Sequence, residues 1–173
     1  MVDAANYSVF ETRRDGRRVE IRALRPSDRD DLIAAVRRTS SQSLYRRFFA
    51  VKRAFTDQEV EFFSNVDFVS HVALVALVDE GGGSSIVGGG RYVVVEPGQA
   101  ELAFAVVDEY QGQGIGARLL KHLAAIAREQ GLRELIADVL PDNIAMLRVF
   151  ENSGLPCRST HGRDVVQVTL RLS

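Results

Sequence analysis

The sequence predicts a single α/β domain over residues 1–173, built on a mixed and largely antiparallel sheet of six to seven strands with helices on both faces. Two alternating strands near the N-terminus precede a group of helices, and three strands rich in aliphatic residues and separated by glycine turns follow between residues 71 and 107. A strand–helix–strand unit then covers residues 100–140, and a crossover of this kind makes a parallel strand pair. This order of elements predicts the mixed sheet.

The N-terminal elements begin with two predicted strands, 7–13 and 18–24, joined at the turn pair Asp15-Gly16. A helix is expected from Ser27, whose hydroxyl can cap it, because acidic residues that favour the positive end of a helix follow directly. Residues 40–49 have the pattern of a second, short helix. A capping-box pattern, T-D-Q-E at residues 56–59, predicts a third.

The second half of the chain starts with predicted strands at 71–78, 86–95 and 100–107. The middle strand contains three consecutive glycines, residues 88–90, which indicate a bulge or the close approach of another backbone. A helix is expected over 114–130, where Gly131 can terminate it. A strand at 133–140, a helix at 143–153 and an alternating strand at 164–171 follow.

The composition excludes several classes of function. The formal net charge of -1 gives no excess of positive charge for binding nucleic acid. There is no apolar run of roughly 18 residues that could span a bilayer, and the first ten residues lack the pattern of a secretory signal. The one cysteine, Cys157, cannot form an internal disulfide and is interpreted as structural or incidental, so we expect a cytoplasmic location. The three histidines lack metal-ligand spacing; His122 is expected on the wet side of its helix, and no metal is predicted.

The segment from Gln111 to Gly116 has the pattern of an anion-binding turn at the start of a helix. Backbone N–H groups at a helix start lack intrahelical partners, and glycines let a phosphate approach them closely. Residues 112–117 also fit the dinucleotide pattern G-x-G-x-x-A, but four residues separate the turn from its strand and antiparallel strands precede it. A P-loop is excluded because no Gly-Lys-Ser/Thr follows. A glycine turn without a ligand remains open.

These residues resemble a known family. The pattern Gln111-x-x-Gly114-x-Gly116 between a strand and a helix is similar to the pyrophosphate loop of the GNAT-superfamily N-acetyltransferases. The segments at 143–147 and 153–155 and the order of elements are similar to that family as well, so the resemblance covers almost the whole chain. It implies acetyl-CoA as cosubstrate and a crossover strand pair, 100–107 and 133–140, that splays apart around the pantetheine arm. The implied cofactor-binding residues are Val106, Val107, Gln111, Gly112, Gln113, Gly114, Ile115, Gly116, Ala117 and Asn143.

An amine with a pKa of roughly 10.4 is mostly ammonium near neutral pH, so its transfer reaction needs a base. Glu101 is the one charge inside the strand 100–107, and alternation places it on the same face as two alanines that leave room for a ligand. We therefore expect Glu101 to be the catalytic base; the alternative is a carboxylate that only faces solvent. The strand's main chain, near Val106, would hold the oxyanion. Many GNAT enzymes have a tyrosine as general acid where this chain has Phe150, which cannot donate a proton.

The acceptor is indicated by the N-terminal third. Residues 40–49 and 55–59 resemble the substrate-side helices of bacterial protein-lysine acetyltransferases, and the A-E-L-A segment at 100–103 resembles their catalytic strand. This resemblance implies a protein lysine as acceptor, for example on a protein like acetyl-CoA synthetase. A small-molecule amine acetyltransferase and a non-catalytic acetyl-CoA sensor are the alternatives. A basic cluster could contact an acidic protein surface or the cofactor's phosphates, or be a solvated helix face; it comprises Arg46, Arg47, Lys52 and Arg53. The sequence leaves open the oligomeric state, the acyl-chain preference and the regulation.

Overall fold

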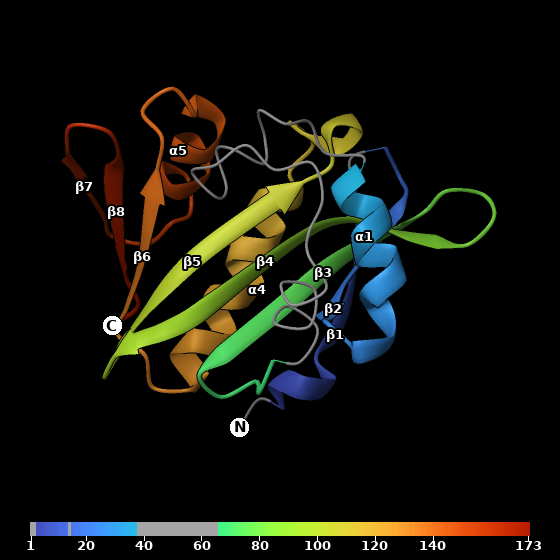
Figure 1. Cartoon of the computed structure of the whole chain (residues 1–173), viewed down its shortest axis with the longest axis horizontal. Helices are drawn as coiled ribbons and strands as arrows, with labels where there is room; N and C mark the ends of the chain where they lie inside the picture. The colour runs from blue at the N-terminus through green and yellow to red at the C-terminus, as the bar shows by residue number, and fades with distance from the viewer. Residues whose placement is uncertain (1–2, 14, 38–65) are drawn as a thin grey trace.

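The computed structural model describes residues 3–13, 15–37 and 66–173 (Figure 1). Within them the strands and α-helices are β1 (Ser8–Thr12), β2 (Arg18–Ala23), α1 (Arg29–Arg37), β3 (His71–Asp79), β4 (Ser84–Glu96), β5 (Gln99–Val106), α4 (Ile115–Glu129), β6 (Glu134–Val139), α5 (Ile144–Glu151), β7 (Cys157–His161) and β8 (Val166–Arg171). Three short 3₁₀ turns are η1 (Ala4–Asn6), η2 (Pro26–Asp28) and η3 (Asp108–Tyr110). The helices predicted at 40–49 and from 56 onward, and the basic cluster of Arg46, Arg47, Lys52 and Arg53, lie outside the described residues.

The described strands form one sheet in the order β1-β2-β3-β4-β5-β6-β8-β7. Within it, β5 and β6 pair in parallel and every other neighbouring pair is antiparallel. This confirms the predicted fold class, although the sheet has eight strands where six to seven were predicted. The additional strand is β7, which is polar and exposed along its whole length. An edge strand of this kind has no apolar alternation, so its sequence has the pattern of a loop.

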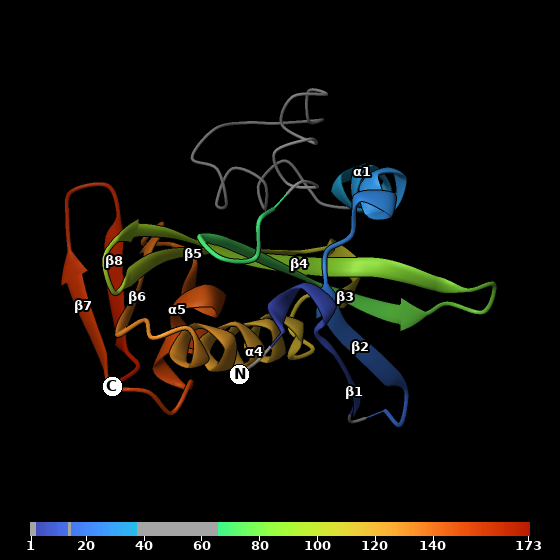
Figure 2. The same cartoon turned by 90° about the horizontal axis from the view of Figure 1, so that it is seen from below.

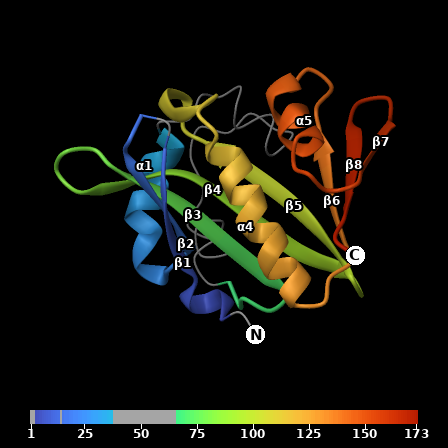
Figure 3. The same ribbon diagram turned by 180° about the vertical axis from the view of Figure 1, so that it is seen from behind.

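Helices cover both faces of the sheet, as predicted. Figure 2 shows α1 on one face, with α4 and α5 on the other. Seen from behind, α4 runs across the middle strands (Figure 3), and its inner stripe is almost completely buried: Leu119, Leu120, Leu123 and Ile126. Gly131 adopts a φ of 84°, and the N–H groups of Gly131 and Leu132 donate to the carbonyls of Arg128 and Ala127. The helix therefore ends in a Schellman motif at the predicted glycine.

The expectation of a bulge at the three glycines of β4 is confirmed beside them, whereas the close neighbours of Gly90 are side chains and not another backbone. The register between β3 and β4 shifts between Ala76 and Leu77, which marks an irregularity beside the glycines. A Cβ on Gly90 would stand 2.6 Å from Phe104 Cδ1 and 3.0 Å from Leu123 Cδ1. A side chain at position 90 would therefore push Phe104 and α4 away from the sheet, because packed interiors have no spare volume.

Two expectations were wrong, one at the start of α1 and one in α4. The chain enters α1 through η2, where the Asp28 carboxylate, not the Ser27 hydroxyl, accepts the Arg25 N–H at 2.8 Å. Asp28 also binds Arg22 through two hydrogen bonds of 2.7 and 2.8 Å, and both side chains are buried. His122, expected on the wet side of α4, is 6% exposed because β1 folds against that side of the helix. Its ring contacts the Tyr7 hydroxyl at 2.5 Å and the Glu11 carboxylate.

No helix in the described part of the chain is long and apolar enough to cross a membrane.

Candidate functional site

The parallel strands β5 and β6 pair over three residues only. Gln99, Ala100 and Glu101 lie opposite Glu134, Leu135 and Ile136. Beyond Glu101, β5 continues to pair with β4, while β6 pairs with β8 on its far side. The two strands therefore part after Glu101 and leave a gap that widens toward the start of α4. This is the splayed pair that the family resemblance implied.

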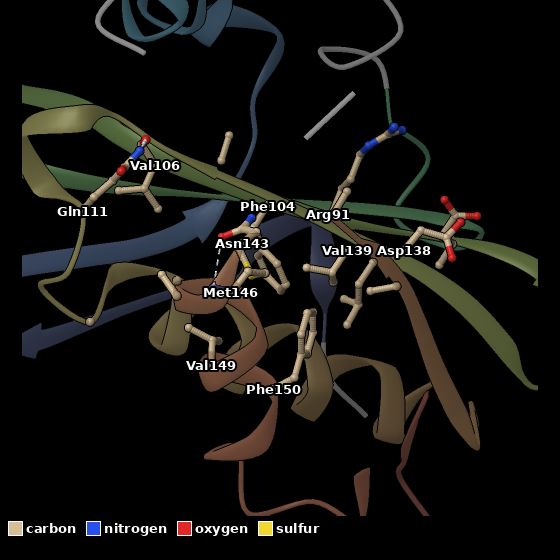
Figure 4. Close-up of a pocket in the computed structure, with 18 of the residues that line it drawn as sticks. Arg91, Phe104, Val106, Gln111, Asp138, Val139, Asn143, Met146, Val149 and Phe150 are labelled. Carbon is tan, nitrogen blue, oxygen red and sulfur yellow. Dashed lines mark hydrogen bonds between the residues drawn. The ribbon is translucent and has the colours of Figure 1, made fainter. Parts of the chain in front are cut away.

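A cleft of about 630 Å³ occupies this gap. It is lined by residues of β4, β5 and β6, by the first turns of α5 and by the glycine turn that opens α4 (Figure 4). Phe104 of β5 and Phe150 of α5 form an aromatic pair in its wall, with ring centroids 6.1 Å apart. Phe150, which the family resemblance matched to the general-acid tyrosine of many GNAT enzymes, is 1% exposed and lines the cleft.

The glycine turn has the geometry of an anion site. Gly112 and Gly114 adopt φ values of 75° and 85°, which side-chain-bearing residues avoid. Gly114 is the N-cap of α4, and no side-chain hydrogen bond caps that helix at Gly114. The first N–H groups of α4, at the positive end of the helix dipole, thus lack a side-chain cap at the cleft wall. Ile115 anchors the turn, since its side chain is 1% exposed.

The glycine at position 116 indicates whether the turn fits a phosphate ligand. It lies in the helix, where any residue could adopt its conformation, and it lines the cleft. A Cβ added there would meet only Val149 Cγ2, at an ordinary 4.0 Å. Neither the backbone nor the packing of the described residues therefore requires glycine at position 116. A bound group that comes close to the helix start would require it, so the residues fit the pyrophosphate of coenzyme A.

The two glutamines of the turn hold its shape. Gln111 Nε2 donates to the carbonyl of Val106 at 3.0 Å and so ties the turn to the end of β5. Gln113 Nε2 donates to the carbonyl of Glu109 at 2.8 Å, and its Oε1 accepts a hydrogen bond from Arg13. Of the residues predicted to bind the cofactor in this turn, four line the cleft and three do not: Gln111, Gly112, Gly114 and Gly116 against Gln113, Ile115 and Ala117.

The main chain of Val106 points toward the gap. The N–H of Val107 donates to the carbonyl of Val87 at 2.9 Å, so the opposed residues Val106 and Gly88 form a non-hydrogen-bonded pair. In such a pair the N–H and C=O groups point away from the neighbouring strand, here toward the side that β6 has left. Val107, the second predicted main-chain contact, instead uses its N–H toward β4 and its carbonyl for the N–H of Tyr110.

Asn143 stands at the end of the other strand. It is the N-cap of α5, and its Oδ1 accepts the N–H of Met146 at 3.3 Å. It also lines the cleft, on the wall opposite the one built by β5 (Figure 4). The family resemblance implied that Asn143 approaches the cofactor, and the structure places it at the same cleft as the glycine turn.

Glu101 is exposed and lies at the point where the two strands part. The predicted alternation is present, because Ala103 and Ala105 are less buried than Leu102 and Phe104. Across the β4–β5 ladder, Val93 lies opposite Glu101 and Arg91 lies opposite Ala103. Burial lowers the pKa of the Arg91 guanidinium, and the charge of Glu101 opposes that shift.

Sequence reasoning missed two charged residues that line this cleft, Arg91 and Asp138. Both stand on predicted strands, but the sequence did not reveal the strand register that brings them to the cleft that Glu101 also lines. Among the described residues there is no group of three histidine, cysteine, aspartate or glutamate side chains that could hold a metal ion.

Comparisons with known proteins agree with this geometry. Residues 38–155 match the Acetyltransferase (GNAT) family. An acetyltransferase of Pseudomonas aeruginosa is 35% identical over 133 residues, which are 76% of this chain and 72% of that relative. The acetyltransferase Pat of Mycolicibacterium smegmatis is 33% identical over 143 residues, and these cover 82% of this chain but only 42% of Pat. The crystal structure of the GNAT domain of S. lividans PAT superposes with a TM-score of 0.85 at 32% identity, covering 95% of this chain and 96% of that domain.

Proposed function

The chain belongs to the GNAT acetyltransferase family and is an acetyl-CoA-dependent N-acetyltransferase, and from that premise we propose that its acceptor is a protein lysine and that Glu101 is the base. The observation that carries the proposal is the position of Glu101. Its carboxylate is exposed, lines the cleft and stands where β5 and β6 part. The small side chains of Ala103 and Ala105 follow it on the same face and leave room beside it.

The lysine ammonium must lose a proton before the reaction can begin. A lysine ammonium has a pKa of roughly 10.4 and no lone pair to offer, so one of its N–H bonds must break before nitrogen can attack. Glu101 would accept that proton, directly or through a water molecule. Phe150 has no proton to return, so the leaving thiol is not protonated by a side chain at that position.

Acetyl-CoA, when bound, supplies the activated acetyl group. The glycine turn and the start of α4 would hold its pyrophosphate, and the Val106 main chain and Asn143 would hold the arm in the gap. The apolar rings of Phe104 and Phe150 form the neighbouring wall, and water screens an electrostatic contact less beside an apolar wall than in open solvent.

Support for a protein acceptor comes from the resemblance of residues 40–49, 55–59 and 100–103 to bacterial protein-lysine acetyltransferases. The similarity to Pat and to the GNAT domain of S. lividans PAT adds to it. A lysine on a protein like acetyl-CoA synthetase is the acceptor we propose to test first. The cytoplasmic location expected from the sequence stays a prediction.

The experiment compares wild type, Glu101→Gln and the control Glu129→Gln, whose carboxylate is exposed at the far end of α4. Each is incubated with acetyl-CoA and with an acetyl-CoA synthetase, or with a panel of free amines that includes spermidine and lysine. We expect acetylated synthetase lysine with wild type and the control, and a loss of about 10²- to 10⁴-fold with Glu101→Gln. Binding of acetyl-CoA should be the same for all three proteins.

Each part of the proposal has its own contrary outcome. Transfer by Glu101→Gln at the wild-type rate would remove Glu101 as the base. Strong turnover of a free amine, with no labelling of the synthetase, would replace the protein lysine by a small-molecule acceptor. Binding of acetyl-CoA without transfer to any amine would identify a sensor.

A further inference from the structure

Asp138 and Glu101 lie on the same face of the sheet, one on each side of the gap between the strands. Ile136 lies opposite Glu101 in the parallel ladder, and directly opposed residues point to the same face of a sheet. Asp138 follows Ile136 by two residues, so its side chain is on the same face of the sheet. It is the next residue on that face after Ile136, the last residue of β6 that pairs with β5. Both carboxylates are exposed and both line the cleft, one from each parting strand, and Figure 4 shows Asp138 at the cleft.

The cleft has a simple balance of charge. Among the described residues that line it, the charged ones are Arg91, Glu101 and Asp138, which leave one negative charge in excess. Arg91 stands on β4, on the other side of β5 from Asp138, and its charge interacts with Glu101. The excess negative charge therefore lies toward Asp138, on the wall opposite β5.

This balance suits a singly charged amine. An ammonium group carries three N–H donors and one positive charge, and carboxylates are the acceptors that form the stronger, charge-assisted hydrogen bonds with it. With Glu101 on one wall and Asp138 on the other, one ammonium can donate to both. When one N–H proton passes to Glu101, that N–H bond breaks, an O–H bond forms, and the neutral amine can still donate to Asp138. The nitrogen lone pair is then held in the gap between the strands.

We propose that Asp138 is an acceptor-binding residue that holds a singly charged primary amine across the gap from Glu101. This inference rests on the proposed function and narrows its substrate class. An amine with several positive charges, such as spermidine, would bring more positive charge than the one excess negative charge of the cleft can balance, and the positive charge of Arg91 would repel the remainder. An arylamine that is neutral near pH 7 would gain nothing from Asp138.

The test compares wild type, Asp138→Asn, Asp138→Glu and Glu134→Gln under saturating acetyl-CoA. Glu134 is the matched control, since it stands on the same strand and the same face as Asp138 but does not line the cleft. The probes are Nα-acetyl-lysine methylamide, which carries one ammonium, and 4-methoxyaniline, which is neutral at the assay pH. Calorimetric titration of the lysine probe into each protein with coenzyme A bound gives a readout that needs no turnover.

For the lysine probe we expect Asp138→Asn to raise KM and weaken binding about fivefold, as befits one charge-assisted contact in an open cleft, with kcat within about twofold of wild type. Asp138→Glu should recover part of the loss, because the carboxylate returns. Glu134→Gln should behave as wild type, and the KM for 4-methoxyaniline should not change in any variant.

Equal KM and equal affinity for the lysine probe in wild type and Asp138→Asn would overturn the inference and leave Asp138 as a solvated strand residue. An equal rise in KM for 4-methoxyaniline would also overturn it, since a general disturbance of the cleft does not distinguish the two amines. If wild type acetylates neither probe nor any protein lysine, the proposed function fails. The titration then still decides whether Asp138 binds the ammonium.

Discussion

Replacing Gly116 by alanine should separate the stability of the fold from its affinity for coenzyme A. The glycine lies in the first turn of α4 with helical geometry, and the new Cβ would meet only Val149 Cγ2 at 4.0 Å. Alanine is favoured over glycine in a helix by up to about 1 kcal/mol. The melting temperature should therefore stay the same or rise by about 2–4 °C.

The added methyl group projects from the same helix turn whose N–H groups would bind the pyrophosphate. A hydrogen bond to a charged group contributes about 1.5–3 kcal/mol, so the loss of one such contact should weaken coenzyme A binding about ten- to hundredfold. Calorimetric titration gives the affinity and scanning calorimetry the melting temperature. Gly82→Ala is the control, because a Cβ at position 82 would meet no atom within 4 Å and Gly82 does not line the cleft. Unchanged affinity in a folded Gly116→Ala protein would refute the assignment of this turn to the pyrophosphate.

Three further perturbations test other parts of the structure. Gly90→Ala should lower the free energy of unfolding, measured with urea, by about 1–3 kcal/mol, because its Cβ would stand 2.6 Å from the Phe104 ring. Gly89→Ala is the control and should lower it much less, because the nearest atom to its Cβ is at 3.5 Å. Equal losses in the two variants would contradict the packing argument. Asp28→Asn should cost about 3–5 kcal/mol at neutral pH, because it leaves the buried Arg22 without its carboxylate. Burial raises the pKa of Asp28, but the hydrogen bonds from Arg22 and Arg25 outweigh burial and hold the pKa in the folded protein below 3.8. The Asp28 carboxylate therefore stabilises the folded protein above pH 3.8, and this stabilisation is lost as pH falls through the pKa of the folded state. Unfolding measured as a function of acid pH should show this loss in wild type and not in Asp28→Asn. Arg13→Ala should weaken coenzyme A binding about threefold, as expected for one lost hydrogen bond that braces the glycine turn, while Arg18→Ala on the same hairpin should leave binding unchanged.

The fold was largely predictable because its signals are local. Alternating strands, the stripe of α4 and its terminal glycine each depend on residues within one element, and the observed bounds of α4 differ from those predicted by one residue at each end. The errors have a common cause in tertiary structure. β7 shows no alternation because an exposed edge strand needs none, and His122 was misplaced because β1 covers the side of α4 that its own periodicity leaves outside.

The site was predictable in part for the same reason. The glycine turn, Glu101 and Asn143 stand in short patterns, and the structure brings all three to one cleft. Arg13, Arg91 and Asp138 could not be found in this way. The hydrogen bond from Arg13 to Gln113 joins residues 100 positions apart, and Arg91 reaches the site through its register against Ala103. Such pairings depend on how the strands align, which no local pattern of this sequence encodes.

The point at which β5 and β6 stop pairing shapes both the proposed cofactor site and the proposed acceptor site. If β6 had followed β5 beyond Glu101, the main-chain groups of Val106 would meet a neighbouring strand and the carboxylates of Glu101 and Asp138 would stand along one closed ladder. Because the strands part, main-chain groups on that side of β5, such as the N–H of Val106, face the gap and not a neighbouring strand, and a ligand that carries amides can bind them as a strand would. The same divergence sets the two carboxylates on facing walls at the narrow end of the gap. If the proposed function is right, the family's cosubstrate and its acceptor would meet at Glu101, where the hydrogen-bond ladder between β5 and β6 ends.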